Sequence, residues 1–125
     1  MNSTQLAQQA YAPSGGAIRT GRANEYLVFT QITARLAKFR DARGSDFRHL
    51  ASALYDNRRL WTLLAAEVAE ANNALPDDLR ARIFYLAEFT QHHSRLVLSG
   101  KAGVDPLIEI NSAVADGLGD GGTRR

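Results

Sequence analysis

Two long segments with the residue pattern of amphipathic helices, joined by a short turn, occupy residues 45–100 and constrain the fold most strongly. Within each segment the core-facing residues recur every three or four positions, so that they fall on one face of a helix. In the first segment this face carries Phe47, Leu50, Leu54, Trp61, Leu64, Ala65 and Val68. In the second segment it carries Leu79, Ile83, Leu86, Thr90, His93 and Val97. The sequence therefore predicts a helical hairpin.

The ends of these two helices carry recognisable stop and start signals. Asn72 and Asn73 favour the end of the first helix, because asparagine tolerates the left-handed conformation that terminates helices. Pro76 suits the first position of the second helix, and the two aspartates that follow it complement the positive end of the helix dipole. Gly100 is the expected C-terminal cap.

Three further helices are predicted outside the hairpin, over residues 4–11, 22–41 and 105–118, and no strand is. The last of them begins at an Asp-Pro pair, which combines a capping side chain with a first-turn proline. The glycine-rich residues 119–125 hold too little apolar surface to order themselves, so we expect a disordered tail there.

These elements predict an all-α fold, a compact bundle of four main helices plus a short N-terminal helix, in one domain over residues 1–118. Short connections between helices favour antiparallel neighbours. The first helix of the hairpin should be central in the bundle. Its Leu60 and Leu63 lie on a different side from its main apolar face, and one packing partner cannot cover both sides.

Composition sets further limits on the class of protein. A chain of 125 residues is long enough for one core without metal or disulfide staples. The absence of cysteine excludes disulfides, thiolate metal sites and cysteine catalysis. No apolar run approaches the roughly 20 residues that span a bilayer, and the first residues do not form a secretory signal. We therefore expect a cytoplasmic protein with no membrane insertion.

The charge pattern argues against nucleic-acid binding. The chain holds 15 basic and 13 acidic residues, a net charge of +2. Its arginines are spread along the whole length and interleaved with acidic residues, whereas nucleic-acid binding needs them gathered on one face. The pattern is typical of a mixed, solvated surface.

No catalytic, cofactor or metal site is predicted. The histidines are His49, His92 and His93, and no pair has the four-residue spacing of a helical metal site. His93 falls near the apolar face, where a satisfied core residue is expected. None of the glycine clusters joins a strand to a helix as a phosphate-binding loop does.

The chain resembles a known family in the order of several short motifs. These are DNRRLWTLLA, an N-x-LP turn, LRARIFYLAEF and LIEIN, with TQLAQQAY near the start. Their order and spacing are similar to those of FlaF, a family of flagellar biosynthesis regulators from alphaproteobacteria. The resemblance implies a small non-enzymatic protein that controls flagellin production and supports flagellin export by contacting flagellin. A further flagellar regulator or a component of the export gate could complete the complex.

Two other functions compete with this interpretation. One is an RNA-binding regulator that acts on flagellin message. The sequence predicts neither the basic patch nor the stacking platform that RNA binding needs. The other is a scaffold bundle whose role is to oligomerise. The salt dependence of binding distinguishes an RNA-binding regulator from a protein-binding one. Measuring the molecular mass in solution distinguishes an oligomeric scaffold from a monomeric chaperone.

The candidate binding surface combines aromatic and apolar residues with arginines. Phe84 projects away from the main apolar face of its helix, and Tyr85 with Phe89 forms a second stripe. Aromatic residues beside arginines are typical of protein interfaces. We expect an amphipathic helical end of flagellin to lie across this surface. The candidate contacts are Arg58, Leu60, Trp61, Leu63, Arg80, Phe84, Tyr85, Phe89 and Arg95.

Two asparagines fall on apolar helix faces, Asn57 in the first helix of the hairpin and Asn111 in the last helix. Each amide either ties a loop or a helix end to the core, or lies open in a groove and pairs with a partner's backbone. If Trp61 is buried its indole N–H needs an acceptor, and Asn57, one turn earlier, is the candidate.

Asp56 and Arg59 have the spacing of an ion pair on the helix surface.

Overall fold

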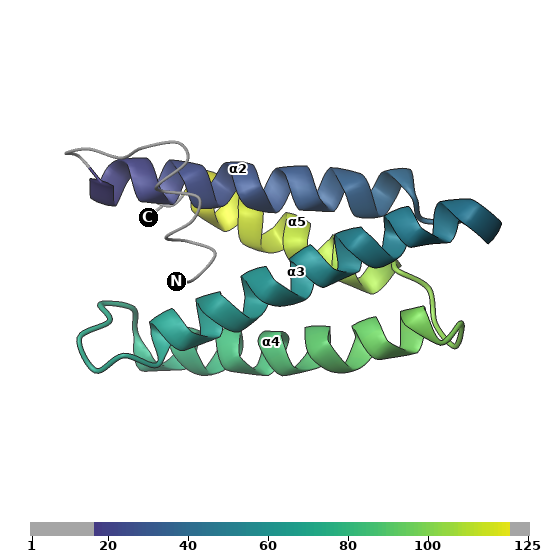
Figure 1. Ribbon diagram of the computed structural model, residues 1–125. Coiled ribbons are helices and arrows are strands. Elements are labelled where there is room, and N and C mark those ends of the chain that lie inside the picture. The colour runs from purple at the N-terminus through teal and green to yellow at the C-terminus, as the bar shows by residue number, and fades with distance from the viewer. Residues whose placement is uncertain (1–16, 121–125) are drawn as a thin grey trace.

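The computed structural model describes residues 17–120, with side-chain surroundings for residues 26–116 (Figure 1). This part of the chain contains α2 (Ala17–Lys38), the 3-10 turn η1 (Gly44–Asp46), α3 (Phe47–Val68), α4 (Asp77–Leu98) and α5 (Asp105–Asp120), and no strand. The predicted all-α bundle with four main helices is therefore confirmed. The short helix predicted over residues 4–11 lies outside the described residues.

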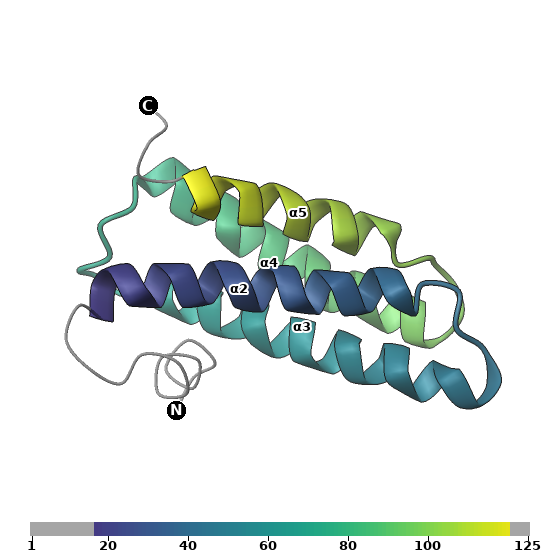
Figure 2. The ribbon, with the colours of Figure 1, turned by 90° about the horizontal axis from the view of Figure 1, so that it is seen from above.

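The four helices run alternately up and down, as short connections require (Figure 1). α3 packs mainly against α4, and α5 packs mainly against α2. Contacts between α2 and α3 join the two pairs, and α4 meets α5 only over a small area. Figure 2 shows α2 and α5 lying side by side with α3 and α4 beyond them. The outward side of α4 therefore faces no other described helix.

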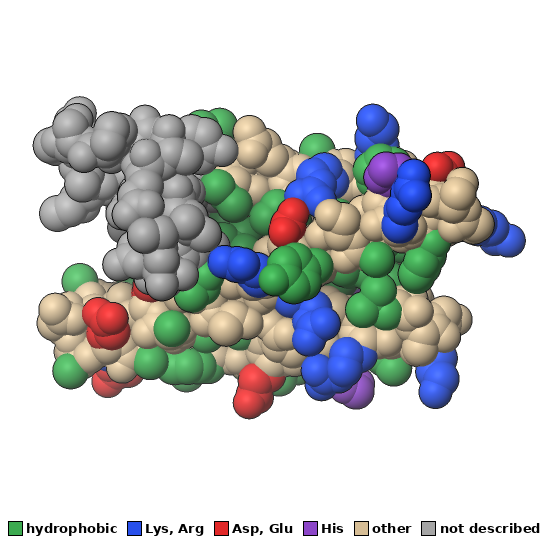
Figure 3. Space-filling view, viewed as in Figure 1, with side chains coloured by type: hydrophobic (Ala, Val, Ile, Leu, Met, Phe, Trp, Pro, Cys, Tyr) green, Lys and Arg blue, Asp and Glu red, His purple; other side chains and the backbone are tan. Residues whose placement is uncertain are grey.

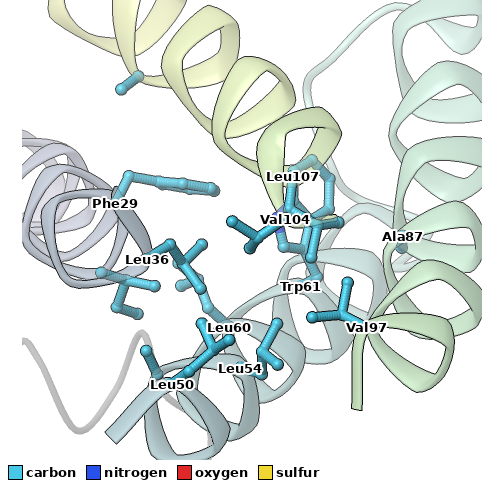
Figure 4. Packing of buried hydrophobic residues seen from close by; sticks show 13 residues of the cluster. Phe29, Leu36, Leu50, Leu54, Leu60, Trp61, Ala87, Val97, Val104 and Leu107 are labelled. Atoms are coloured by element: carbon cyan, nitrogen blue, oxygen red, sulfur yellow. The ribbon is translucent and has the colours of Figure 1, made fainter. Parts of the chain in front are cut away.

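The core lies where the four helices meet, and Trp61 is at its centre with no exposed surface. The indole packs edge to face on Phe29 of α2, with ring centroids 5.8 Å apart. Figure 4 shows the buried apolar side chains filling the space between the helices. The cluster consists of Phe29, Ile32, Leu36, Leu50, Ala53, Leu54, Leu60, Trp61, Ala87, Val97, Val104, Leu107 and Ala115.

α4 buries fewer apolar side chains than its pattern predicts. Leu79, expected on the core face, is 37% exposed, and Ile83 is half-buried. Polar side chains occupy much of the buried face instead, namely Thr90, His93 and Ser94. α4 therefore contributes polar side chains to the interior beside its apolar ones, Ala87 and Val97.

The connection between α3 and α4 is built by side chains that bind backbone groups. α3 ends at Val68, before the asparagines that were expected to end it. The Arg80 Nε donates a hydrogen bond to the Val68 carbonyl at 2.7 Å, and its Nη2 donates to the Glu70 carbonyl at 3.1 Å. The Val68 carbonyl lies in the last turn of α3 and lacks an intrahelical partner, whereas the Glu70 carbonyl also accepts from the Asn73 N–H at 3.0 Å. Asn73 closes the same turn, because its Nδ2 donates to the Glu67 carbonyl at 3.2 Å.

The C-terminus of α4 forms a Schellman motif at Gly100, as the sequence predicts. Gly100 has a φ of 77°, in the left-handed region that glycine adopts without a steric penalty. The Lys101 N–H donates to the Leu96 carbonyl at 2.8 Å, and the Gly100 N–H donates to the Val97 carbonyl at 3.0 Å. These two bonds satisfy carbonyl groups that the helix leaves unpaired.

We expect Gly100→Ala to lower the free energy of unfolding by about 1 kcal/mol, because alanine is strained at a positive φ. This corresponds to a fall in Tm of about 4 °C for a domain of this size. A Cβ at Gly100 would meet no atom within 4 Å, so the effect is conformational rather than a clash. The matched control is Gly103→Ala, also free of contacts and without a positive φ. Equal Tm values for the two variants would contradict the assignment.

Candidate partner-binding surface

Two of the predicted contact residues belong to the core and cannot contact a partner in this conformation. Leu60 is 3% exposed and Trp61 is fully buried. α3 is covered on two sides, by α2 and by α4, so Leu60 is buried although it lies off the main apolar face of the helix. Including these two residues in the binding surface was therefore wrong.

Trp61, Asn111 and Asn57 form a buried hydrogen-bonded chain that joins α3 to α5. The indole Nε1 of Trp61 donates to the Asn111 Oδ1 at 2.9 Å. The Asn111 Nδ2 then donates to the Asn57 Oδ1 at 2.7 Å. Neither asparagine lies open in a groove, since both are fully buried. Asn57 is not the acceptor for the indole, as had been expected, because the indole N–H points across to α5 rather than back along α3.

Three polar atoms inside the bundle have no hydrogen-bond partner among the described residues. They are the Asn57 Nδ2, the Thr90 Oγ1 and the Ser94 Oγ. Gln91 of α4 bonds to both Arg58 and Thr62 of α3, and this register places Ser94 at the level of Asn57 in the antiparallel pair. The polar interior therefore lies at the α3–α4 contact.

Arg80 serves the fold rather than the rim of a binding surface. Its side chain is 23% exposed, and two of its nitrogens cap the end of α3. The third lies 3.7 Å from the Asp77 carboxylate. We predicted Arg80 at the polar rim from its position on the helix face. The sequence does not reveal that α3 ends close enough for this guanidinium to bind its last carbonyl.

The outward face of α4 presents the exposed aromatic side chains. Phe84 is 41% exposed and Tyr85 is 66% exposed. Phe89 is half-buried and packs against the core, where its ring stacks on His93 with centroids 5.2 Å apart. His93 Nε2 lies 2.7 Å from the Gly103 carbonyl and so joins α4 to the loop before α5. Phe84 and Tyr85 are thus the accessible part of the predicted aromatic set, and Arg95 is exposed on the same helix.

A hollow of about 320 Å³ lies on the outer side of α3, next to α4. Its lining residues are Tyr55, Arg58, Arg59, Thr62, Leu63 and Gln91. Arg58 and Leu63 were predicted contacts, and the other four were missed. The spacing of 55, 58, 59 and 62 places these residues on one face of a helix, but only the packing of α4 brings Gln91 to them.

The ion pair predicted between Asp56 and Arg59 is wrong. The Asp56 carboxylate instead accepts a hydrogen bond from the Arg35 Nη1 of α2 at 2.7 Å. A partner on a neighbouring helix replaces the partner on the same helix because α2 lies beside this part of α3. Arg59 lies against the Tyr55 ring, 6.0 Å from its centroid.

The described residues contain no group of three or more metal-ligating side chains. No helix among them is both long enough and apolar enough to cross a membrane.

A family model described as the flagellar protein FlaF matches residues 7–118, which is nearly the whole chain. The chain belongs to the FlaF family. Comparison with curated proteins and with solved structures found no match. FlaF membership agrees with the resemblance of the sequence motifs and makes this chain a flagellar protein.

Proposed function

We propose that this FlaF-family chain is a non-enzymatic regulator of flagellum biogenesis that binds flagellin in the cytoplasm, supports its export and tunes its synthesis. The observation that carries the proposal is the pair of exposed aromatic side chains, Phe84 and Tyr85, on the open face of α4 in a member of a flagellar family. Large aromatic residues are enriched among the residues that dominate protein interfaces.

The proposed binding mode places an amphipathic helix of flagellin along the outward face of α4. Phe84 and Tyr85 would be the apolar anchors, with the half-buried Phe89 one turn after Tyr85. Arg95 would supply a charged group at the rim. Burying apolar surface contributes about 25 cal/mol per Å² to the binding free energy, and the cost of association is subtracted from this gain. A shallow aromatic face buries limited surface, so we expect a reversible complex.

Regulation follows in this proposal from occupancy of the α4 face. Free protein would leave Phe84 and Tyr85 accessible to a further flagellar regulator or to a component of the export gate. Protein bound to flagellin would cover them. A ligand shifts an equilibrium only when it binds one state better than the other. Here flagellin and the second partner would compete for the same surface on α4, so binding of one would exclude the other.

The experiment that tests the proposal is calorimetric titration of the full chain with flagellin at low and high salt. We expect micromolar or tighter binding with a negative heat-capacity change, the mark of buried apolar surface. Its affinity should change little with salt. An absence of binding would refute the proposal.

The same titration with RNA from the flagellin message tests the alternative function. Phosphate contacts produce a steep fall in affinity with rising salt. Salt-sensitive RNA binding without flagellin binding would favour the RNA-binding regulator.

A further inference from the structure

Arg58 and Arg59 in the hollow on α3 are both held by neutral groups. The Arg58 Nε donates a hydrogen bond to the Gln91 Oε1 at 3.0 Å. The Arg59 guanidinium lies 6.0 Å from the centroid of the Tyr55 ring, within the range of a cation–π contact. An amide and an aromatic ring orient a guanidinium without cancelling its charge. Two neighbouring positive charges therefore remain available at the hollow.

Gln91 fixes the position of Arg58 through three hydrogen bonds between α4 and α3. Its Oε1 accepts from the Arg58 Nε, while its Nε2 donates to the Arg58 carbonyl at 3.1 Å and to the Thr62 Oγ1 at 2.9 Å. All the bonds run to one short stretch of α3, so the amide cannot rotate without losing them. The terminal nitrogens of Arg58 have no hydrogen-bond acceptor among the described residues.

No acidic side chain in the described part of the chain neutralises the arginines of the hollow. The nearest carboxylate in sequence, Asp56, is already bound to Arg35 at 2.7 Å. Neither Arg58 nor Arg59 forms an ion pair with any described residue, and the same holds for Arg95 of α4. Figure 3 shows basic side chains beside hydrophobic ones over the middle of α3 and α4 on this face.

We propose that this hollow binds the carboxylates of an acidic helical segment of a partner protein. The guanidinium group matches a carboxylate in charge and in its two-pronged hydrogen-bond geometry. Leu63 and Tyr55 supply apolar surface for the aliphatic part of a glutamate or for a neighbouring leucine. A hollow of about 320 Å³ accommodates a few side chains of the segment rather than the whole helix.

The structure favours a protein over a nucleic acid as the occupant. Nucleic-acid affinity comes from many phosphate contacts along a basic track and from open aromatic faces on which bases stack. Here the basic groups are few, and the Arg59 guanidinium lies over the Tyr55 ring. The site goes beyond the proposed function, because it lies on α3 and does not require that flagellin binds the α4 face.

The test measures binding of the full chain to a labelled synthetic helical peptide of about four turns, with glutamate and leucine on one face. We expect the peptide to bind, and Arg58→Gln with Arg59→Gln to weaken binding at least about tenfold, as the loss of charge-assisted hydrogen bonds requires. A peptide with glutamine in place of glutamate should bind correspondingly weakly. Arg59→Gln alone breaks no hydrogen bond in the described structure and should also weaken binding.

The matched control is Arg43→Gln with Lys101→Gln, which removes the same charge at exposed positions that do not line the hollow. Equal binding of the glutamate and glutamine peptides would overturn the proposal, as would an equal loss in the control variant or no binding at all. Tighter binding of single-stranded RNA that is lost in the Arg58 and Arg59 variant would identify a nucleic-acid site instead. None of these outcomes depends on flagellin.

Discussion

Replacing Asn111 with alanine is expected to lower the free energy of unfolding by about 3 kcal/mol. The substitution leaves the Trp61 indole N–H and the Asn57 Oδ1 without their partners, and both groups are fully buried. An unsatisfied buried polar group costs about 1–3 kcal/mol, and the smaller side chain adds a cavity. Chemical denaturation measures the change through the midpoint and slope of the transition.

Thr90→Val is the matched control for this prediction. Thr90 is also fully buried and polar, but its hydroxyl has no hydrogen-bond partner among the described residues. Valine has nearly the same shape, so the variant should be neutral or slightly more stable. If Asn111→Ala stays within about 0.5 kcal/mol of the wild type, the range of ordinary surface substitutions, the chain from Trp61 to Asn57 does not stabilise the bundle.

The second large effect is expected from Phe84→Ala combined with Tyr85→Ala. We expect at least about a tenfold loss of affinity for flagellin, because truncating an aromatic anchor at an interface costs about 1–2 kcal/mol or more. The free energy of unfolding should change little, since Phe84 is 41% and Tyr85 66% exposed. Calorimetric titration measures the affinity, and denaturation confirms that the fold is intact.

Tyr26→Ala with Leu27→Ala is the matched control. These side chains are 38% and 45% exposed and lie on α2, away from the proposed surface. The control removes a similar amount of exposed apolar surface and should leave the affinity within about twofold of the wild type. An equal loss in both double variants would show that general surface hydrophobicity, and not the α4 face, governs binding.

Features that depend on local chemistry were predictable from the sequence. The fifth helix was expected to begin at Asp105, and α5 does begin there. Gly100 ends α4 as expected, because the positive φ it needs is a property of glycine itself. The predicted hairpin is present with the expected direction of its two helices (Figure 1).

Features that depend on contacts between distant residues were not predictable. The acceptor for the Trp61 indole is Asn111, 50 positions away in the sequence. Arg35 binds Asp56 from a different helix, 21 positions away. Arg80 reaches back to cap α3, which ends before the asparagines that locally favour its termination. Periodicity identifies the face of a helix but not the partner that covers it.

The observed ends of α2 and α5 differ from the predicted ones. α5 continues to Asp120, two residues beyond its expected end at residue 118, and residues 121–125 lie outside the described part of the chain. α2 begins at Ala17, five residues before its expected start, and ends at Lys38 rather than at residue 41. The low apolar content that predicted a disordered tail from residue 119 did not prevent the helix from continuing to Asp120.

The most direct test of flagellin binding at α4 is chemical-shift mapping of the isotope-labelled chain during titration with flagellin. We predict that the largest shifts occur along the outward face of α4, at Phe84, Tyr85 and their neighbours. Amides of α2 and α5 should change little, because those helices lie on the other side of the bundle (Figure 2). Shifts concentrated on α2 and α5, with α4 unchanged, would contradict the proposed binding surface.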